Sequence, residues 1–164
     1  IAVEIYLGKN SSLEKYYMKN FMYAMEHSYS VMKTEVNLIL RKTDYTIEDE
    51  NRIFYVVGMC LHAMLDYAER IQSNDLDKDT LNAFKYANNG LKHGIELETV
   101  TKSTGGMTFP IYFPLEIPVR RIIWKVKWDA RSKQQQKMYL QYLDGKDVVS
   151  TCGEFIERLK QLSI

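Results

Sequence analysis

Apolar residues recur three and four positions apart along most of the first hundred residues, which is the spacing of one helix face. Residues 11–41 predict a helix of roughly 30 residues, opened by a capping box at Ser11 and Glu14. Residues 1–10 are expected to form a short extended or irregular lead-in. Glu35 falls inside the apolar stripe, so we expect it to be paired, protonated or facing a cleft, with Lys92 or His27 as candidate partners. The stripe consists of Leu13, Tyr17, Phe21, Ala24, Ser28, Val31, Met32, Leu38 and Ile39.

Two further amphipathic segments follow. Thr46 begins a second helix that ends near Ser73, and His62 points away from its apolar face. A third, shorter helix begins near Thr80. Short connections between long helices are typical of antiparallel neighbours in an up-down bundle. The second stripe consists of Ile53, Val57, Cys60, Leu61, Met64, Ala68 and Ile71, and the third of Leu81, Phe84, Ala87, Leu91 and Ile95.

The pattern changes to alternation after the third helix. Residues 104–106, Thr-Gly-Gly, predict a turn, and apolar positions then alternate with polar residues and prolines over residues 107–115 and 122–128. This period of two is that of a strand. We therefore expect a β-hairpin or extended arm over residues 107–128.

Two more helices complete the expected set. Asp129 or Ser132 begins a helix that runs to Leu143, and residues 144–147 form a turn. Asp147 caps the last helix, whose stripe consists of Val148, Cys152, Phe155, Leu159 and Leu162. These elements predict a mainly α fold, an up-down helical bundle in one domain over residues 1–164, with a short β-hairpin inserted after the third helix.

Composition narrows the function classes. The chain has 164 residues, 46% of them hydrophobic, which is enough for one substantial core. No apolar run is long enough to cross a bilayer and the N-terminus lacks a signal-peptide layout, so we expect no membrane association. The net charge of +1 argues against a dedicated binder of duplex nucleic acid. Cys60 and Cys152 fall on apolar stripes, which favours buried thiols in a reducing, cytoplasmic compartment. The Cys and His spacing fits no metal site, and we expect no cofactor.

The end of the third helix carries polar residues that a buried helix does not need. Lys85, Asn89 and His93 follow one another at four-residue steps, nearly opposite the apolar stripe. Asn88 lies at the edge of that stripe and Lys92 beside it. Histidine titrates near neutral pH, and amide and ammonium groups bind phosphate oxygens, so this is where we expect any chemistry.

Together with the helix pair before it, this segment resembles the HEPN superfamily. The family motif is an Arg followed four to six residues later by a His, frequently with an Asn directly after the Arg. The matching segment here is Asn88-Asn89-Gly90-Leu91-Lys92-His93, in which Asn89 and His93 match and Asn88 stands at the Arg position. The resemblance covers residues 12–97, so the hairpin lies outside it.

The resemblance implies a function. HEPN proteins are small all-α bundles, often homodimers, found in toxin–antitoxin, phage-defence and other RNA-cleaving systems. The implied activity is a metal-independent endoribonuclease, in which the 2′-hydroxyl attacks the adjacent phosphorus and leaves a 2′,3′-cyclic phosphate. His93 would be the acid–base group, Asn88 and Asn89 the phosphate or ribose donors, and Lys92 the cation. The implied partners are RNA, a second copy of the chain, and an antitoxin or other partner protein.

Structural interpretations stand beside these roles. His93 is also an ordinary cation at a helix C-terminus, and Asn88 and Asn89 also satisfy helix-end carbonyls. On a regular helix Asn88 and His93 diverge by about 140°. A shared site would then need a distortion at Gly90 or residues from two subunits. His27 and His62 are interpreted as surface or flanking residues.

A basic segment offers a second surface. Lys85, Arg120, Arg121 and Lys125 are candidate substrate-binding residues. The last three, interleaved with aromatic residues, could bind single-stranded RNA. Strand parity predicts instead a solvated charged face and a packed tryptophan face, which we favour. The full set of basic and aromatic residues is Arg120, Arg121, Trp124, Lys125, Lys127, Trp128, Arg131, Lys133 and Lys137.

Two functions follow from these observations. The first is a HEPN-like RNA-targeting protein of a microbial defence or toxin system, with metal-independent endoribonuclease activity as its expected chemistry. The second is a catalytically inactive HEPN-like module for dimerisation or protein interaction. The Asn at the Arg position favours the second, whereas Asn89, Lys92 and His93 together favour the first.

Overall fold

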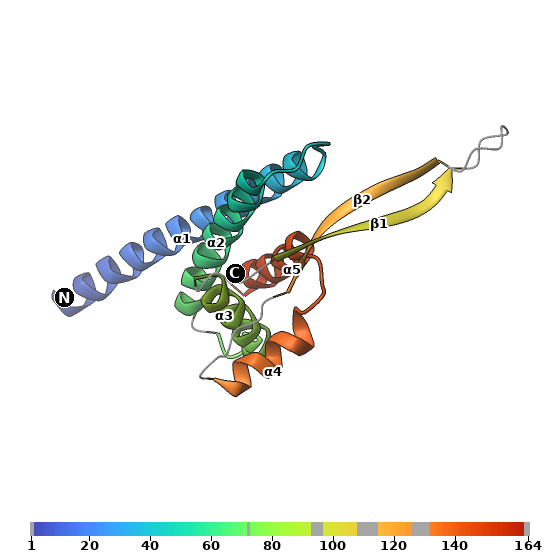
Figure 1. Cartoon of the computed structure of the whole chain (residues 1–164). Helices are drawn as coiled ribbons and strands as arrows, with labels where there is room; N and C mark the ends of the chain where they lie inside the picture. Colours follow the sequence, from blue (N-terminus) through green and yellow to red (C-terminus); the bar gives the residue numbers. More distant parts are fainter. Residues whose placement is uncertain (1, 72, 93–96, 108–114, 126–131, 163–164) are drawn as a thin grey trace.

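The computed structural model describes residues 2–71, 73–92, 97–107, 115–125 and 132–162. The prediction of a mainly α helical bundle is confirmed. A hairpin projects from one side of the packed helices (Figure 1). The helices are α1 (Ala2–Leu40), α2 (Ile47–Arg70), α3 (Lys78–Lys92), α4 (Lys133–Tyr142) and α5 (Val148–Gln161), and the strands are β1 (Leu97–Met107) and β2 (Leu115–Trp124).

The two long helices α1 and α2 run antiparallel, and two side-chain contacts fix their register. The guanidinium of Arg70 lies 3.7 Å from the ring centroid of Phe21. Further along the pair, Arg52 forms an ion pair with Glu35. Glu35 is therefore paired, as expected, but its partner is Arg52 and neither Lys92 nor His27. Helix α1 has 39 residues and α2 has 24, so the N-terminal part of α1 extends well beyond the end of α2 (Figure 1).

The irregular lead-in expected over residues 1–10 is wrong, because α1 already begins at Ala2. The capping-box match at Ser11 lies inside the helix and does not start it. Extending an existing helix needs no new nucleus, so a Gly or Ser in its interior lowers stability by only about 1 kcal/mol and does not end it. A capping motif predicts a helix start only where the preceding residues leave the helix.

The buried face of α1 differs in part from the predicted stripe. Tyr17, Ala24 and Leu38 were assigned to that stripe but are exposed. The buried positions are Met25, Ser28, Met32, Val36 and Ile39. Apolar and aromatic residues occur on several faces of α1, so packing against α2 and α5 decides which of them are covered. The predicted stripes of α2 and α5 are confirmed, since nearly all their members are buried.

The start of α2 is capped as predicted. Thr46 accepts a hydrogen bond from the backbone N–H of Asp49, whose carboxylate accepts one from the backbone N–H of Thr46. Lys42 also donates to this buried carboxylate. The hydrogen bond from Lys42, together with those from Thr46, outweighs burial and lowers the pKa of Asp49 below its ordinary value.

The hairpin is present but begins earlier than predicted. Residues 107–128 were expected to hold it, whereas β1 starts at Leu97 and pairs there with Trp124. Residues 104–106, predicted as a turn, belong to β1. The register shifts between Thr104 and Met107, so the two glycines occupy a bulge, where an extra residue is accommodated without a turn. Residues 108–114 and 126–128 of the expected arm lie outside the described residues.

The inner end of the hairpin is joined to α5. The indole Nε1 of Trp124 donates to Oγ1 of Thr151 at 2.8 Å. Backbone hydrogen bonds connect Trp124 to Lys146 and to Gly145, the latter with a φ of 71° in the turn before α5. Trp124 is fully buried, which confirms the prediction of a packed tryptophan at this position.

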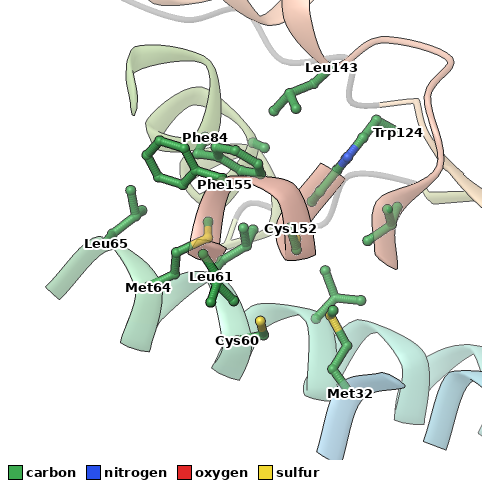
Figure 2. Packing of buried hydrophobic residues seen from close by; sticks show 14 of the residues in the cluster. Met32, Cys60, Leu61, Met64, Leu65, Phe84, Trp124, Leu143, Cys152 and Phe155 are labelled. Carbon is green, nitrogen blue, oxygen red and sulfur yellow. The ribbon is translucent and has the colours of Figure 1, made fainter. Parts of the chain in front are cut away.

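One hydrophobic cluster holds the elements together, with buried residues from all five helices and from β2. Phe84 packs on Phe155 with ring centroids 4.9 Å apart, next to Trp124 (Figure 2). Cys60 and Cys152 are free and buried, as predicted. A hydrogen bond with Cys60, together with complete burial, raises the pKa of the Cys152 thiol well above its ordinary value. None of the described helices is long and apolar enough to cross a membrane.

Candidate functional site

A cleft of about 800 Å³ opens between α1, α2 and the last turns of α3. Small residues on its walls, Ala24, Gly58 and Ala63, leave the space between the helices unfilled. A Cβ placed on Gly58 would meet nothing within 4 Å. The other lining residues are Phe21, Tyr23, His27, Ser28, Phe54, Tyr55, Met59, His62, Asp66, Asn88, Leu91 and Lys92.

The motif segment contributes two of its residues to this cleft. Asn88 and Lys92 lie one helical turn apart on α3 and both line the space. Asn88 is only 8% exposed, whereas Lys92 is exposed. A buried amide and a solvated ammonium therefore share one edge of the cleft. His93 lies outside the described residues, so its convergence with Asn88 stays a prediction.

The other two residues of the motif cluster do not line the cleft. Nζ of Lys85 lies 3.0 Å from Oε1 of Glu69 on α2, so this ammonium already has a counter-ion. Asn89 is half-buried and is absent from the cleft walls. Lys85 and Asn89, predicted to lie on one line of α3, therefore face a different side of the helix from Asn88 and Lys92.

Two histidines enter the cleft from the other helices. The ring of His27 on α1 stacks on Tyr23 with centroids 5.8 Å apart and an interplanar angle of 9°. On α2, Nε2 of His62 lies 3.7 Å from Oδ2 of Asp66. Both histidines are exposed, as predicted, yet they line the same space as Asn88.

The sequence interpretation of His27 and His62 as surface or flanking residues missed this shared location. One signal was available, since His62 and Asp66 stand four residues apart on one helix face and Tyr23 and His27 share the same spacing. Only the antiparallel register of α1 and α2 brings these two pairs to one cleft. That register depends on long-range packing, which spacing within one helix does not encode.

The described basic residues of the hairpin do not form one surface with an aromatic face. Arg120 donates to the backbone carbonyl of Lys42 at 2.7 Å, next to the α1–α2 connection. Arg121 is exposed and lines a separate hollow of about 340 Å³ beside α5. Lys125 is half-buried, and the buried ring of Trp124 offers no stacking surface. Of the remaining members, Lys127, Trp128 and Arg131 lie outside the described residues, and Lys133 and Lys137 are exposed on α4.

The described parts of the chain contain no group of three His, Cys, Asp or Glu side chains arranged to hold a metal ion. Comparisons with family models, with curated proteins and with solved structures found no match to this chain. The described walls of the cleft offer aromatic rings, two imidazoles, an amide, a carboxylate and one ammonium.

Proposed function

We propose that this chain is a HEPN-like RNA-targeting protein that binds single-stranded RNA in the cleft between α1, α2 and α3. The observation that carries the proposal is the combination of exposed aromatic rings with Asn88 and Lys92 around one open space. Each of these groups contacts a different part of a nucleotide.

The aromatic rings are the candidate base-binding groups. Tyr23 on α1 and Tyr55 on α2 are 67% and 68% exposed on opposite walls of the cleft. Large aromatic side chains are normally more covered than this in a folded protein. Stacking of an unpaired base on such a ring contributes about 1–3 kcal/mol and tolerates every base.

The edge formed by α3 supplies the candidate phosphate contacts. The ammonium of Lys92 is exposed, and no ion pair of its side chain is found among the described residues. The Asn88 amide beside it can donate a hydrogen bond to a phosphate or ribose oxygen. Sequence-tolerant binding through rings and one cation suits unpaired RNA, whose bases are accessible, better than a duplex.

The test is a binding titration of fluorescein-labelled mixed-sequence RNA, single-stranded and as a matched duplex, followed by fluorescence anisotropy. We expect Tyr55→Ala and Lys92→Ala each to weaken single-strand binding about 5-fold or more, consistent with losses of 1 kcal/mol upwards. Tyr55→Phe keeps the ring, and Lys33→Ala removes an exposed lysine of α1 that does not line the cleft, so both should bind like the wild type. Equal binding by all variants, or a preference for the duplex, would refute the proposal.

A second function is favoured by a different observation. Large apolar or aromatic side chains outside the cleft walls are also exposed on α1 and α2, namely Tyr16, Tyr17, Leu38 and Ile47. Exposed side chains of this kind are candidate contacts for another protein chain. This supports an inactive module that pairs with a second copy or with an antitoxin-type partner. Light scattering over a concentration series tests it: Leu38→Lys and Ile47→Lys should lower the apparent mass of a dimer, and a monomer at all concentrations would exclude self-association.

A further inference from the structure

The two histidines of the cleft lie level with each other on neighbouring helices. The register of the α1–α2 pair is fixed by the contacts of Phe21 with Arg70 and of Glu35 with Arg52. Interpolating between these contacts along the two helices places His27 opposite His62. Packed helices have axes about 8–10 Å apart, so the two histidines line neighbouring walls of the cleft at the same level along the helix pair.

The surroundings of the two rings differ. His62 lies next to the Asp66 carboxylate, the natural counter-ion of a protonated imidazole. His27 instead stacks on the neutral ring of Tyr23. The other titratable groups on the described cleft walls are Tyr55 and Lys92. Among the described residues, His62 thus has a carboxylate beside it, whereas His27 has an aromatic ring.

We propose that His27 and His62 are the acid–base pair of a metal-independent RNA cleavage in this cleft, an inference that rests on the proposed RNA binding. His27 removes the proton of the ribose 2′-hydroxyl, and the 2′-oxygen forms a bond to the adjacent phosphorus. The bond from phosphorus to the 5′-oxygen breaks, and His62, as imidazolium, donates its proton to that oxygen. The products are a 2′,3′-cyclic phosphate and a 5′-hydroxyl, so atoms, charge and protons balance without an oxidant or a metal.

The α3 edge completes the arrangement. Negative charge develops on the two non-bridging phosphate oxygens during the attack. The Lys92 ammonium and the Asn88 amide, on the remaining side of the same cleft, are placed to stabilise it. This assignment gives the acid–base function to α1 and α2, whereas the HEPN resemblance gives it to His93.

The test combines cleavage and binding measurements on the full chain in EDTA. We expect His27→Gln and His62→Gln each to lower the cleavage rate about 10²-fold or more, with single-strand affinity within about 3-fold of the wild type. The wild-type rate should give a bell-shaped pH profile. His27→Gln removes the base and should flatten the rise of the rate on the acid side of the profile. His62→Gln removes the acid and should flatten the fall of the rate on the alkaline side. Lys33→Ala, at an exposed position of α1 that does not line the cleft, is the matched control and should leave the profile unchanged.

A modified substrate separates the acid from the base. With sulfur in place of the bridging 5′-oxygen, the leaving thiolate needs no proton, so His62→Gln should recover cleavage while His27→Gln should not. Binding without cleavage by the wild type overturns this inference and leaves RNA binding standing. Loss of cleavage in His93→Gln, with both cleft variants active, overturns it in favour of the motif histidine. Absence of binding refutes the proposed function and this inference with it.

Discussion

The same substitution at two helix-interior glycines should change stability in opposite directions. Gly58 lies in the middle of α2 and Gly153 in α5. A Cβ at Gly58 meets nothing within 4 Å, so Gly58→Ala adds only helix propensity, about 1 kcal/mol. For a chain of this size such a gain raises Tm by about 2–4 °C.

At Gly153 the same methyl group overlaps the hydroxyl of Tyr29. The half-buried Tyr29 ring must then move, which breaks its 3.3 Å hydrogen bond to the carbonyl of Val149. The lost bond costs about 1 kcal/mol, and repacking the ring costs about 1–3 kcal/mol more. After subtracting the propensity gain of about 1 kcal/mol, we expect Gly153→Ala to lower the free energy of unfolding by about 1–3 kcal/mol.

Urea denaturation followed by circular dichroism measures both changes. The double variant Tyr29→Phe with Gly153→Ala is the internal control, because removing the hydroxyl relieves part of the overlap. In that background Gly153→Ala should cost measurably less than it does alone. If Gly153→Ala stabilised the protein as much as Gly58→Ala, the packing of Tyr29 against α5 described above would be wrong.

Three further predictions concern the caps and the core. The hydrogen bond from Lys42 lowers the pKa of Asp49, so its stabilising effect is present above the unfolded pKa near 3.8 and is lost as the pH falls through the folded value. The drop in urea midpoint from pH 7 to pH 3 should therefore be smaller in Asp49→Asn. Trp124→Phe should cost about 2–3 kcal/mol of unfolding free energy, because it removes the bond to Thr151 and leaves a cavity. The raised pKa and burial of Cys152 predict that a thiol reagent labels it at the rate of unfolding, and rapid labelling of the native protein would contradict this.

The spacing of apolar residues predicted a helix and its buried face well where the helix has a single apolar face. The stripe of α2, its cap at Thr46 and the cap of α5 at Asp147 were all predictable, because each depends on residues within one turn. The α1 stripe was less predictable, since its tyrosines and methionines leave several faces apolar. The turn expected at residues 104–106 became a bulge because a long partner strand was present to pair with it.

The candidate site was predictable only in part, for a related reason. Asn88 and Lys92 lie on one helix, so their spacing alone placed them together. His27 and His62 belong to different helices, and their presence in one cleft depends on the register of α1 against α2. That offset is fixed by the contacts of Arg70 and Arg52, each of which joins residues far apart in the sequence.

The joint between the hairpin and α5 has a mechanical consequence. β2 has 10 residues and spans about 33 Å at the usual rise of a strand, yet it is clamped to the bundle at Trp124. A load applied at the Leu115 end of β2 acts with the length of the strand as its lever arm. A force on the outer part of β2 would therefore act on two places in the bundle: the first turn of α5, where Thr151 holds the indole, and the α1–α2 connection, where Arg120 reaches the carbonyl of Lys42.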